Sequence, residues 1–332
     1  MSSNLPTLSP LPDHPMATVI VPNYNHAEFL GETMRSILDQ DYDAIELLIM
    51  DGGSNDQSVE IIKGFASDPR VQWNSEPDIG PMDACFKGLE LARGDLIASI
   101  PSNDTYVPGA IREMVEEFIA DPQLGFVGGW FQGIDSQGNR NDQGRFLRQE
   151  RVDIPVDEII VNYRLPHVNA SMFRRDLARE TIVPELNRHV GDTVFTVHLM
   201  LEAVRRGGHV RAIPKVLNNT RNHDSNRGGN TSLTLADRVE IKRGFKRLTG
   251  VYKSYLSRSQ IRAMRRYSYL RELRFRMHPI HQTFQLIPPL LGYIWYGGYS
   301  HVLRYVGQKL RLLKPRPEGL GQGGDPHSQK QA

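Results

Sequence analysis

The sequence predicts an α/β fold in which helices flank a mostly parallel sheet. Two observations support this prediction. Short apolar, β-branched runs alternate with segments of helical periodicity through the first 120 residues, and the runs end at proline, glycine or carboxylate residues. Strands that alternate with helices form parallel sheets with right-handed crossovers. A chain of 332 residues has room for one large domain of this kind and an appendage.

The expected elements follow one another along the chain. The expected strands are short apolar runs, whereas the expected helices repeat apolar side chains every three or four residues, as Phe29, Leu30 and Met34 do. Asp, Ser, Gly and Asn gather in residues 135–139 and predict a hairpin turn. Strands are expected at residues 17–22, 45–50, 71–74, 95–100, 126–131 and 210–217, and helices at residues 28–40, 58–66, 82–92, 109–120 and 192–206.

The bulk composition indicates a packed globular protein. Hydrophobic residues make up 39% of the chain and charged residues 23%. The net charge of +2 is too small to favour nucleic acid as a partner. Cys85 is the single cysteine, so no intrachain disulfide can form, which fits a reducing, cytoplasmic location. Residues 1–15 are expected to be a flexible leader without a secretory signal, and residues 313–332 a disordered tail.

Polar and acidic blocks follow the expected strands of the first half. Parallel strands bring such blocks to one edge of the sheet, which is where open α/β sheets bind nucleotides and metals. The blocks are Pro22-Asn23-Tyr24-Asn25, Asp51-Gly52-Gly53-Ser54, the turn from Glu76 to Gly80 with Asp83 and Lys87 after it, and Ser102-Asn103-Asp104.

In their order and spacing these blocks resemble the family 2 glycosyltransferases, which have the GT-A fold. The resemblance covers about residues 18–225 and places a GT-A domain at residues 16–230. It implies inverting transfer of a sugar from a nucleotide-sugar donor, a UDP-sugar in the first instance, with a divalent metal, Mg²⁺ or Mn²⁺. The implied acceptor is a glycan or a lipid-linked molecule, in the synthesis of a bacterial surface polysaccharide.

The resemblance also assigns donor-binding roles. Asp51 is the implied carboxylate for base recognition. Asn103, Asp104 and His223 are the implied metal ligands, and Asn103 stands where relatives carry an acid. Its carbonyl oxygen can still ligate a cation, so the alternatives are that Asp104 takes over, that the metal binds more weakly, or that metal dependence is lost. The local alternatives are an ordinary turn at residues 51–54 and a helix cap at Asp83. The implied nucleotide-sugar-binding residues are Pro22, Asn23, Tyr24, Asn25, Asp51, Gly52, Asp78, Gly80, Asp83, Lys87, Ser102 and Asn103.

The implied catalytic residue lies in the second half. Inverting transfer needs a base beside the acceptor hydroxyl. The resemblance places this base at Asp192, where the start of a helix favours an ionised carboxylate. The alternative is that Asp192 only caps the helix. His167, in a segment that resembles the family's strand leading to the acceptor side, and Arg221 are the implied acceptor contacts, with a solvated loop as the alternative for Arg221.

Residues 231–312 are expected to form a helical carboxyl-terminal region. It is strongly basic up to about residue 277 and then free of charged residues, but rich in aromatic ones, from residue 277 to residue 303. Paired prolines and glycines interrupt this second stretch, so an interfacial or protein-packed element is favoured over a spanning helix. Basic residues beside aromatic ones favour peripheral attachment to the inner face of the cell membrane, and an oligomer or core contact is the alternative.

Two rival functions remain open. One rival is a non-catalytic protein that binds sugar nucleotides or glycans. It would explain why Asn103 and Gly191 stand at positions where relatives commonly carry acids. A nucleotidyltransferase would share the sheet and the metal, but it would carry a phosphate loop rich in glycine and arginine, which Pro22-Asn23-Tyr24-Asn25 does not resemble.

Overall fold

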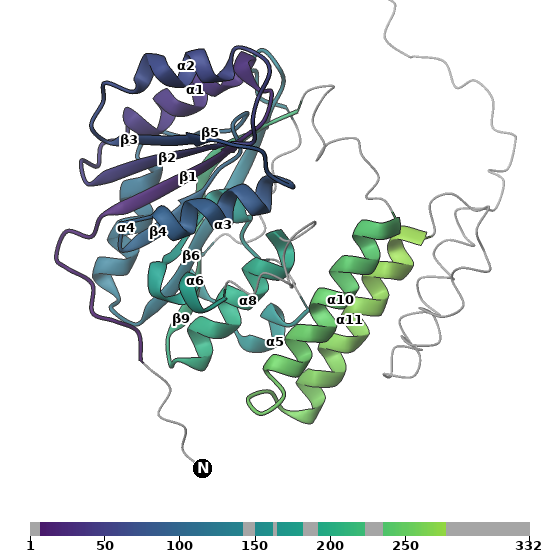
Figure 1. The fold of residues 1–332 in the computed structure, drawn as a ribbon. Helices are drawn as coiled ribbons and strands as arrows, with labels where there is room; N and C mark the ends of the chain where they lie inside the picture. Colours follow the sequence, from purple (N-terminus) through teal and green to yellow (C-terminus); the bar gives the residue numbers. More distant parts are fainter. Residues whose placement is uncertain (1–6, 142–149, 162–164, 182–191, 223–234, 277–332) are drawn as a thin grey trace, which may run out of the picture.

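The computed structural model describes residues 7–141, 150–161, 165–181, 192–222 and 235–276. The strands in this part of the chain are β1 (Ala17–Asn23), β2 (Ile45–Asp51), β3 (Val71–Ser75), β4 (Leu96–Ser99), β5 (Thr105–Tyr106), β6 (Leu124–Ile134), β7 (Val152–Asp153), β8 (Ser171–Arg174) and β9 (His209–Arg221). They form one sheet in the order β3-β2-β1-β4-β8-β6-β9-β5, with β7 paired to β9 (Figure 1).

The sheet is mixed. The strands β3, β2, β1 and β4 are mutually parallel, as the alternation of strands and helices predicts. The strand β8 runs antiparallel to both of its neighbours, β4 and β6, so that β6 returns to the direction of the first four strands. The carboxyl ends of β1 to β4 therefore lie along one edge, and the polar blocks of the sequence follow them there.

Helices cover both faces of this sheet. Side chains of α1, α2 and α4 pack in one hydrophobic cluster, and those of α3, α6 and α8 in the other. The described helices are α1 (Ala27–Leu38), α2 (Ser58–Phe65), α3 (Pro81–Leu91), α4 (Ala110–Ala120), α5 (Val156–Ile159), α6 (Arg175–Thr181), α8 (Asp192–Arg205), α10 (Leu235–Val251) and α11 (Arg258–Arg276), with a 3-10 turn, η1, at Val168–Ala170.

The alternation of side chains along the strands explains the two clusters. In β1, Val19 and Val21 point to the cluster of α1, whereas Ile20 between them points to the cluster of α3. Gly88 lets α3 approach the sheet closely, because a Cβ atom there would lie 2.6 Å from Cγ2 of Ile20. The helix that carries Asp83 and Lys87 is thereby held tightly over β1.

Part of the expected leader is ordered. The guanidinium of Arg174, a buried side chain, donates to the carbonyl of Ser9, and the amide of Ser9 donates to Asp176 at 3.0 Å. Leu8 and Leu11 pack against the two hydrophobic clusters. Residues 7–15 therefore differ from a free leader, because two apolar side chains and a buried arginine hold them to the domain.

The basic helical region consists of two helices, α10 and α11, that pack side by side (Figure 1). Their apolar side chains, among them Phe245, Tyr252 and Met264, join the hydrophobic cluster of α3 and α8. The hydroxyl of Tyr252 donates to Glu202 on α8 at 3.2 Å. The hairpin thus shares its core with the sheet domain.

None of the helices in the described ranges is long and apolar enough to cross a bilayer. The predicted uncharged stretch at residues 277–303 and the predicted tail at residues 313–332 lie outside the described residues.

Candidate functional site

Asp51, at the carboxyl end of β2, is the centre of a hydrogen-bond network. One carboxylate oxygen accepts from Nδ2 of Asn23 at 2.7 Å and from the Ser54 hydroxyl at 2.5 Å. The other accepts from the amide of Ser54 at 2.9 Å and from the Ser75 hydroxyl at 2.6 Å. Burial alone would raise the pKa of Asp51, but these hydrogen bonds outweigh it and hold the pKa below its ordinary value. The charged side chain fastens the ends of β1, β2 and β3 together.

The loop after β1 is locked onto the loop after β2. Asn25 has a φ of 54°, in the left-handed region that asparagine tolerates better than most residues. Its amide donates to the Ser54 hydroxyl at 2.9 Å, and its side-chain oxygen accepts from the amide of Asn55 at 2.9 Å. Tyr24 precedes it and is 51% exposed. The hydrogen-bonded backbone therefore presents the aromatic ring of Tyr24 at the edge of the sheet. Asn23, which was also predicted to bind the donor, is buried.

Asp78 lies against Gly52, so the acidic turn before α3 meets the loop after β2. A Cβ atom on Gly52 would lie 2.6 Å from a carboxylate oxygen of Asp78, and only glycine leaves this space. Asp78 accepts from the amide of Gly80 at 2.8 Å, and Gly80 has a φ of 139° that side chains disfavour. Burial and the nearby charge of Asp83 raise the pKa of Asp78.

Lys87 neutralises part of this acidic turn. Its ammonium lies 2.9 Å from Glu76 and 3.7 Å from Asp83, which is one helical turn earlier on α3. It also donates to the carbonyl of Pro77 at 3.1 Å. The hydrogen bond to Glu76 is the main cause of a raised pKa for Lys87, so the ammonium stays charged.

The tip after β4 points into the protein. Asp104 is 1% exposed and accepts from the amide of Arg221 at 2.9 Å and from Nδ2 of Asn169 at 3.2 Å. Burial raises the pKa of Asp104 to about 6, and these hydrogen bonds limit the rise. Asn103 is also buried, and its carbonyl accepts from Nε of Arg221 at 3.1 Å. Ser102 is buried as well, and its hydroxyl lies 3.0 Å from Nδ1 of His26.

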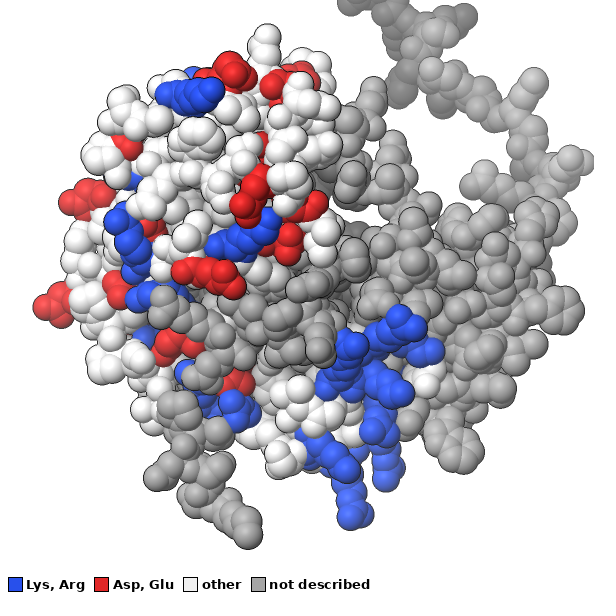
Figure 2. Space-filling model, viewed as in Figure 1, with Lys and Arg blue, Asp and Glu red and all other residues white. Residues whose placement is uncertain are grey.

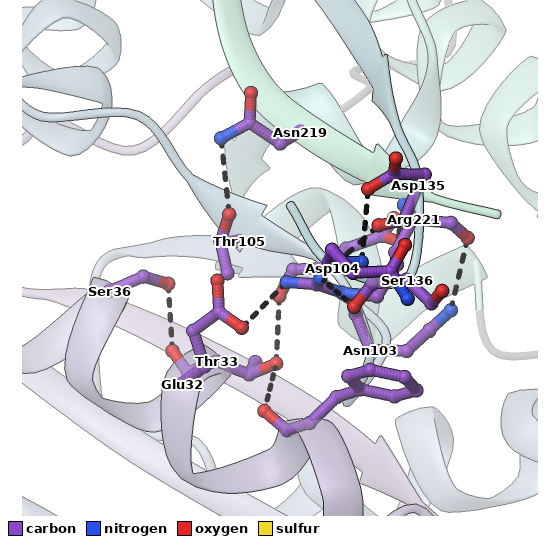
Figure 3. A network of polar contacts seen from close by, with 12 residues as sticks. Glu32, Thr33, Ser36, Asn103, Asp104, Thr105, Asp135, Ser136, Asn219 and Arg221 are labelled. Carbon is purple, nitrogen blue, oxygen red and sulfur yellow. Dashed lines mark hydrogen bonds and ion pairs between the residues drawn. The ribbon is translucent and has the colours of Figure 1, made fainter. Parts of the chain in front are cut away.

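Arg221, at the end of β9, is the centre of this second network (Figure 3). Its guanidinium donates to Glu32 on α1 at 2.6 Å and to the carbonyls of Asp135 and Ser136 at 3.3 Å and 3.1 Å. The guanidinium carbon lies 4.8 Å from the ring centre of Phe29. An acceptor contact was implied here, but the Arg221 side chain is 2% exposed and its donors are used by Glu32 and by backbone carbonyls. Arg221 ties α1, the tip after β4 and the turn at residues 135–139 together.

The implied metal ligands do not form a metal site in the described residues. Asp104 is directed at the amides of Arg221 and Asn169, and the amide group of Asn103 lies 3.5 Å from the carbonyl of Arg221. No group of three or more His, Cys, Asp or Glu in the described part of the chain has the geometry of a metal cage. His223, the third implied ligand, lies outside that part. The buried, uncharged Asn103 therefore does not fit the role of a metal ligand.

Asp192 begins α8 and its side chain is exposed. Its carboxylate accepts from the amide of the next residue, Thr193, at 2.5 Å. Burial lowers the pKa of His167, and the negative charge of Asp192 opposes this shift. The ring of His167 packs 5.1 Å from that of Phe131, and its buried Nδ1 has no hydrogen-bond partner among the described residues.

Cys85 on α3 links the two acidic regions. Burial raises the pKa of its thiol to about 11, and the charges of both Asp192 and Asp78 add to the rise. The helices α3 and α8 also lie close together, because the ring of Phe86 on α3 packs 5.4 Å from that of Phe195 on α8. The structure thus brings the implied base and the implied donor-binding turn to the same side of the sheet.

The partners that complete these networks were not among the predicted site residues. Ser75, Glu32 and Asn218 belong to no recognised motif, and Asn169 lies in a recognised segment in which only His167 was given a role. Glu32 and Arg221 are 189 positions apart in the chain. The position of Ser75 could have been used as a signal. It directly follows the strand expected at residues 71–74, just as Asp51 directly follows the strand expected at residues 45–50.

Comparison with solved structures identifies the fold as that of GT-A glycosyltransferases. Staphylococcus aureus TarS, residues 1–349 in complex with UDP-GlcNAc, matches with a TM-score of 0.65 at 15% identity, over 85% of this chain and 81% of that chain. The mannosyltransferase PcManGT from Pyrobaculum calidifontis, in complex with GDP-Man and Mn²⁺, matches with a TM-score of 0.55 at 18% identity, over 94% of this chain and 85% of that chain. The predicted fold class is confirmed.

Residues 18–181 match the family described as Glycosyl transferase family 2, and through this domain the chain belongs to that family. An uncharacterized glycosyltransferase of Haemophilus influenzae is 34% identical over 128 residues, 38% of this chain and 51% of that protein. A chondroitin synthase of Escherichia coli is 30% identical over 131 residues, 39% of this chain and 19% of that protein. The chain thus spans about half of the first relative and a fifth of the second. The family predicted from the motifs is confirmed.

Proposed function

We propose that the protein transfers a sugar from a nucleotide-sugar donor to a glycan or lipid-linked acceptor with inversion at the anomeric carbon. The observation that supports this most is the packing of Phe86 on α3 against Phe195 on α8, with ring centres 5.4 Å apart, which brings the helix that follows the Asp78 turn to the helix that begins at Asp192. A donor held at Asp78 would then lie beside an exposed carboxylate at a helix start. Two structural relatives hold UDP-GlcNAc and GDP-Man, which supports a nucleotide-sugar donor.

In this proposal the first half of the domain holds the nucleotide. Tyr24 stacks on the base with its exposed ring, and Asp51 keeps the slot in shape through Asn23 and Ser54. Asp78 and Lys87 face the ribose and the diphosphate, and Lys87 supplies a positive charge to the leaving group.

Asp192 is the proposed base. As the acceptor oxygen attacks the anomeric carbon, its proton passes to the Asp192 carboxylate. The new carbon–oxygen bond forms while the bond from that carbon to the diphosphate breaks, and the nucleoside diphosphate leaves with the electron pair. Attack opposite the leaving group inverts the anomeric configuration. The exposure of Asp192 supports this role, because an acceptor hydroxyl can reach it.

We propose that a divalent cation binds together with the diphosphate of the donor, as Mn²⁺ is present with GDP-Man in the PcManGT complex. When bound, such a cation would neutralise charge on the leaving group. The described side chains of Asn103 and Asp104 give it no charged ligand that faces solvent. We therefore expect Mn²⁺ to change the affinity for UDP by less than roughly tenfold, which corresponds to about 1.4 kcal/mol.

The first test is calorimetric titration with UDP, and then GDP, with and without Mn²⁺. Binding of a nucleoside diphosphate supports the donor site, and failure of both would remove the support for a nucleotide-sugar enzyme. Tight binding without transfer or donor hydrolysis would favour the non-catalytic binding protein. Formation of a sugar nucleotide from a nucleoside triphosphate and a sugar phosphate would instead identify a nucleotidyltransferase.

The role of Asp192 has its own test. The change Asp192→Asn is expected to reduce transfer roughly a hundredfold or more and to leave UDP affinity unchanged, because only the proton acceptor is lost. Glu113→Gln, in the first turn of α4, is the matched control and should leave both unchanged. Equal losses of binding and transfer in Asp192→Asn would mark this residue as structural.

A further inference from the structure

The α10–α11 hairpin carries a one-sided charge. Residues 241–269, which lie between Glu240 and Glu272 in the hairpin, contain nine Lys and Arg and no Asp or Glu. Without these nine, the chain retains 31 Lys and Arg against 38 Asp and Glu, a net charge of −7. The small net charge of +2 therefore conceals a strongly basic hairpin on an acidic body. Figure 2 shows this separation, with blue side chains gathered over α10 and α11.

Part of this charge lies on the exposed side of the hairpin. The apolar side of the hairpin packs in the hydrophobic core that it shares with α8. Gly244 lies so close to α8 that a Cβ atom there would be 3.0 Å from Val194. Lys246, Lys253, Arg258 and Arg262 are exposed on the opposite side. Within the described part of the chain, no carboxylate pairs with any of these four.

Two apolar side chains lie among the exposed cations. Val251 ends α10 with 54% exposure, and Tyr255, in the turn between the helices, is 39% exposed. Lys253 lies between them in the sequence, and Arg258 begins α11. An exposed apolar group next to cations in the chain gains little against a soluble polyanion, but it can enter the boundary between headgroups and acyl chains of a bilayer.

The hairpin is oriented so that a surface could bind it without covering the candidate site. Gly244 lies beside Val194 near the start of α8, whereas Tyr252 reaches His198 and Glu202 further along the same helix. The helices α10 and α8 therefore run in the same direction, and the turn after Tyr252 lies at the end of α8 away from Asp192. A helix of 14 residues is about 20 Å long, which separates the turn from the proposed base.

We propose that the outward face of the α10–α11 hairpin docks on an anionic lipid bilayer, with Val251 and Tyr255 entering the headgroup boundary and the surrounding cations facing lipid phosphates and carboxylates. The cytoplasmic leaflet of a cell membrane has this chemistry. The chain continues after α11 into a stretch of 27 residues, 277–303, without a charged side chain and rich in aromatics, which suits the same surface.

The test is co-sedimentation of the full chain with vesicles of phosphatidylcholine alone or mixed with phosphatidylglycerol. Binding is expected only to the anionic vesicles and should weaken in 0.5 M salt, because salt screens the attraction. Each cation near an anionic surface adds roughly a fivefold factor in binding. The triple variant Lys253→Gln, Arg258→Gln, Arg262→Gln should therefore bind roughly a hundredfold more weakly.

A second triple variant, Lys63→Gln, Arg112→Gln, Lys215→Gln, is the matched control, because it removes the same charge from exposed positions outside the hairpin. It should keep vesicle binding. For the apolar contribution, Val251→Ser with Tyr255→Ser should weaken binding, whereas Ile119→Ser, at a 48% exposed position on α4, should not.

Three outcomes would overturn the proposal: equal binding to neutral vesicles, equal losses in both triple variants, or binding to RNA or an anionic polysaccharide with none to vesicles. The last would reassign the hairpin to a soluble polyanion. UDP affinity, measured on the same variants, should stay unchanged. Vesicle binding and UDP binding are separate readouts, so a failure of one leaves the other standing.

Discussion

Replacing Arg221 with methionine is expected to lower the free energy of unfolding by about 4 kcal/mol. Methionine keeps most of the apolar stem against Phe29 but removes every donor. The Arg221 side chain is 2% exposed, so the carbonyls that it reaches lose their donor in a buried environment.

The magnitude follows from the contacts that are lost. Three backbone carbonyls, those of Asn103, Asp135 and Ser136, lose a charged donor, at about 1 kcal/mol each. The cation–π contact with Phe29 contributes about 1 kcal/mol more. The ion pair with Glu32 adds less, because the Glu32 side chain is 53% exposed and water solvates it after the change.

Urea denaturation followed by circular dichroism measures this loss. Arg221→Lys should fall between the wild type and Arg221→Met, since an ammonium keeps the charge but cannot reach all the carbonyls. Arg112→Met, which removes an exposed ion pair with Asp41, is the control and should cost less than about 1 kcal/mol. If Arg221→Met unfolds like the wild type and instead raises the KM for the acceptor, the structural role is refuted and the acceptor contact stands.

Two further predictions concern the carboxylates of the site. The pKa of Asp104 is raised to about 6 from 3.8, so its charge costs stability above pH 6 and that cost disappears as the pH falls to about 4. The stability of the wild type relative to Asp104→Asn should therefore rise by about 2 kcal/mol between pH 7 and pH 4 in urea titrations, and a flat difference would contradict the burial argument. Gly52→Ala should push Asp78 from its position and weaken UDP binding roughly tenfold, whereas Gly64→Ala, with no atom within 4 Å of the new Cβ, should not; equal effects would exclude the contact with Asp78 as the cause.

Local patterns located most elements of the first half. The strand expected at residues 45–50 is β2 (Ile45–Asp51), and the helix expected at residues 109–120 is α4 (Ala110–Ala120). The strand β2 is fully buried and the helix α4 is amphipathic. Both kinds of segment can be located from the spacing of apolar residues in the sequence. The two-residue strands β5 and β7 were missed, because two residues carry no period. The basic region from about residue 233 to 277 was recognised as helical, but its division into two helices was not.

The sequence by itself determined the fold class, the family and the edge of the sheet where the polar blocks gather. Each of these depends on patterns within short stretches, which report burial and turn formation locally. The tertiary structure decided what those residues can do. It turned Asp104 and Arg221 inward by pairing β9 with β5 and β6, left Tyr24 and Asp192 exposed, and placed Lys246, Lys253, Arg258 and Arg262 on the outside of the hairpin. Such outcomes depend on contacts between segments up to 189 positions apart, and no local pattern encodes which distant partner a side chain will meet.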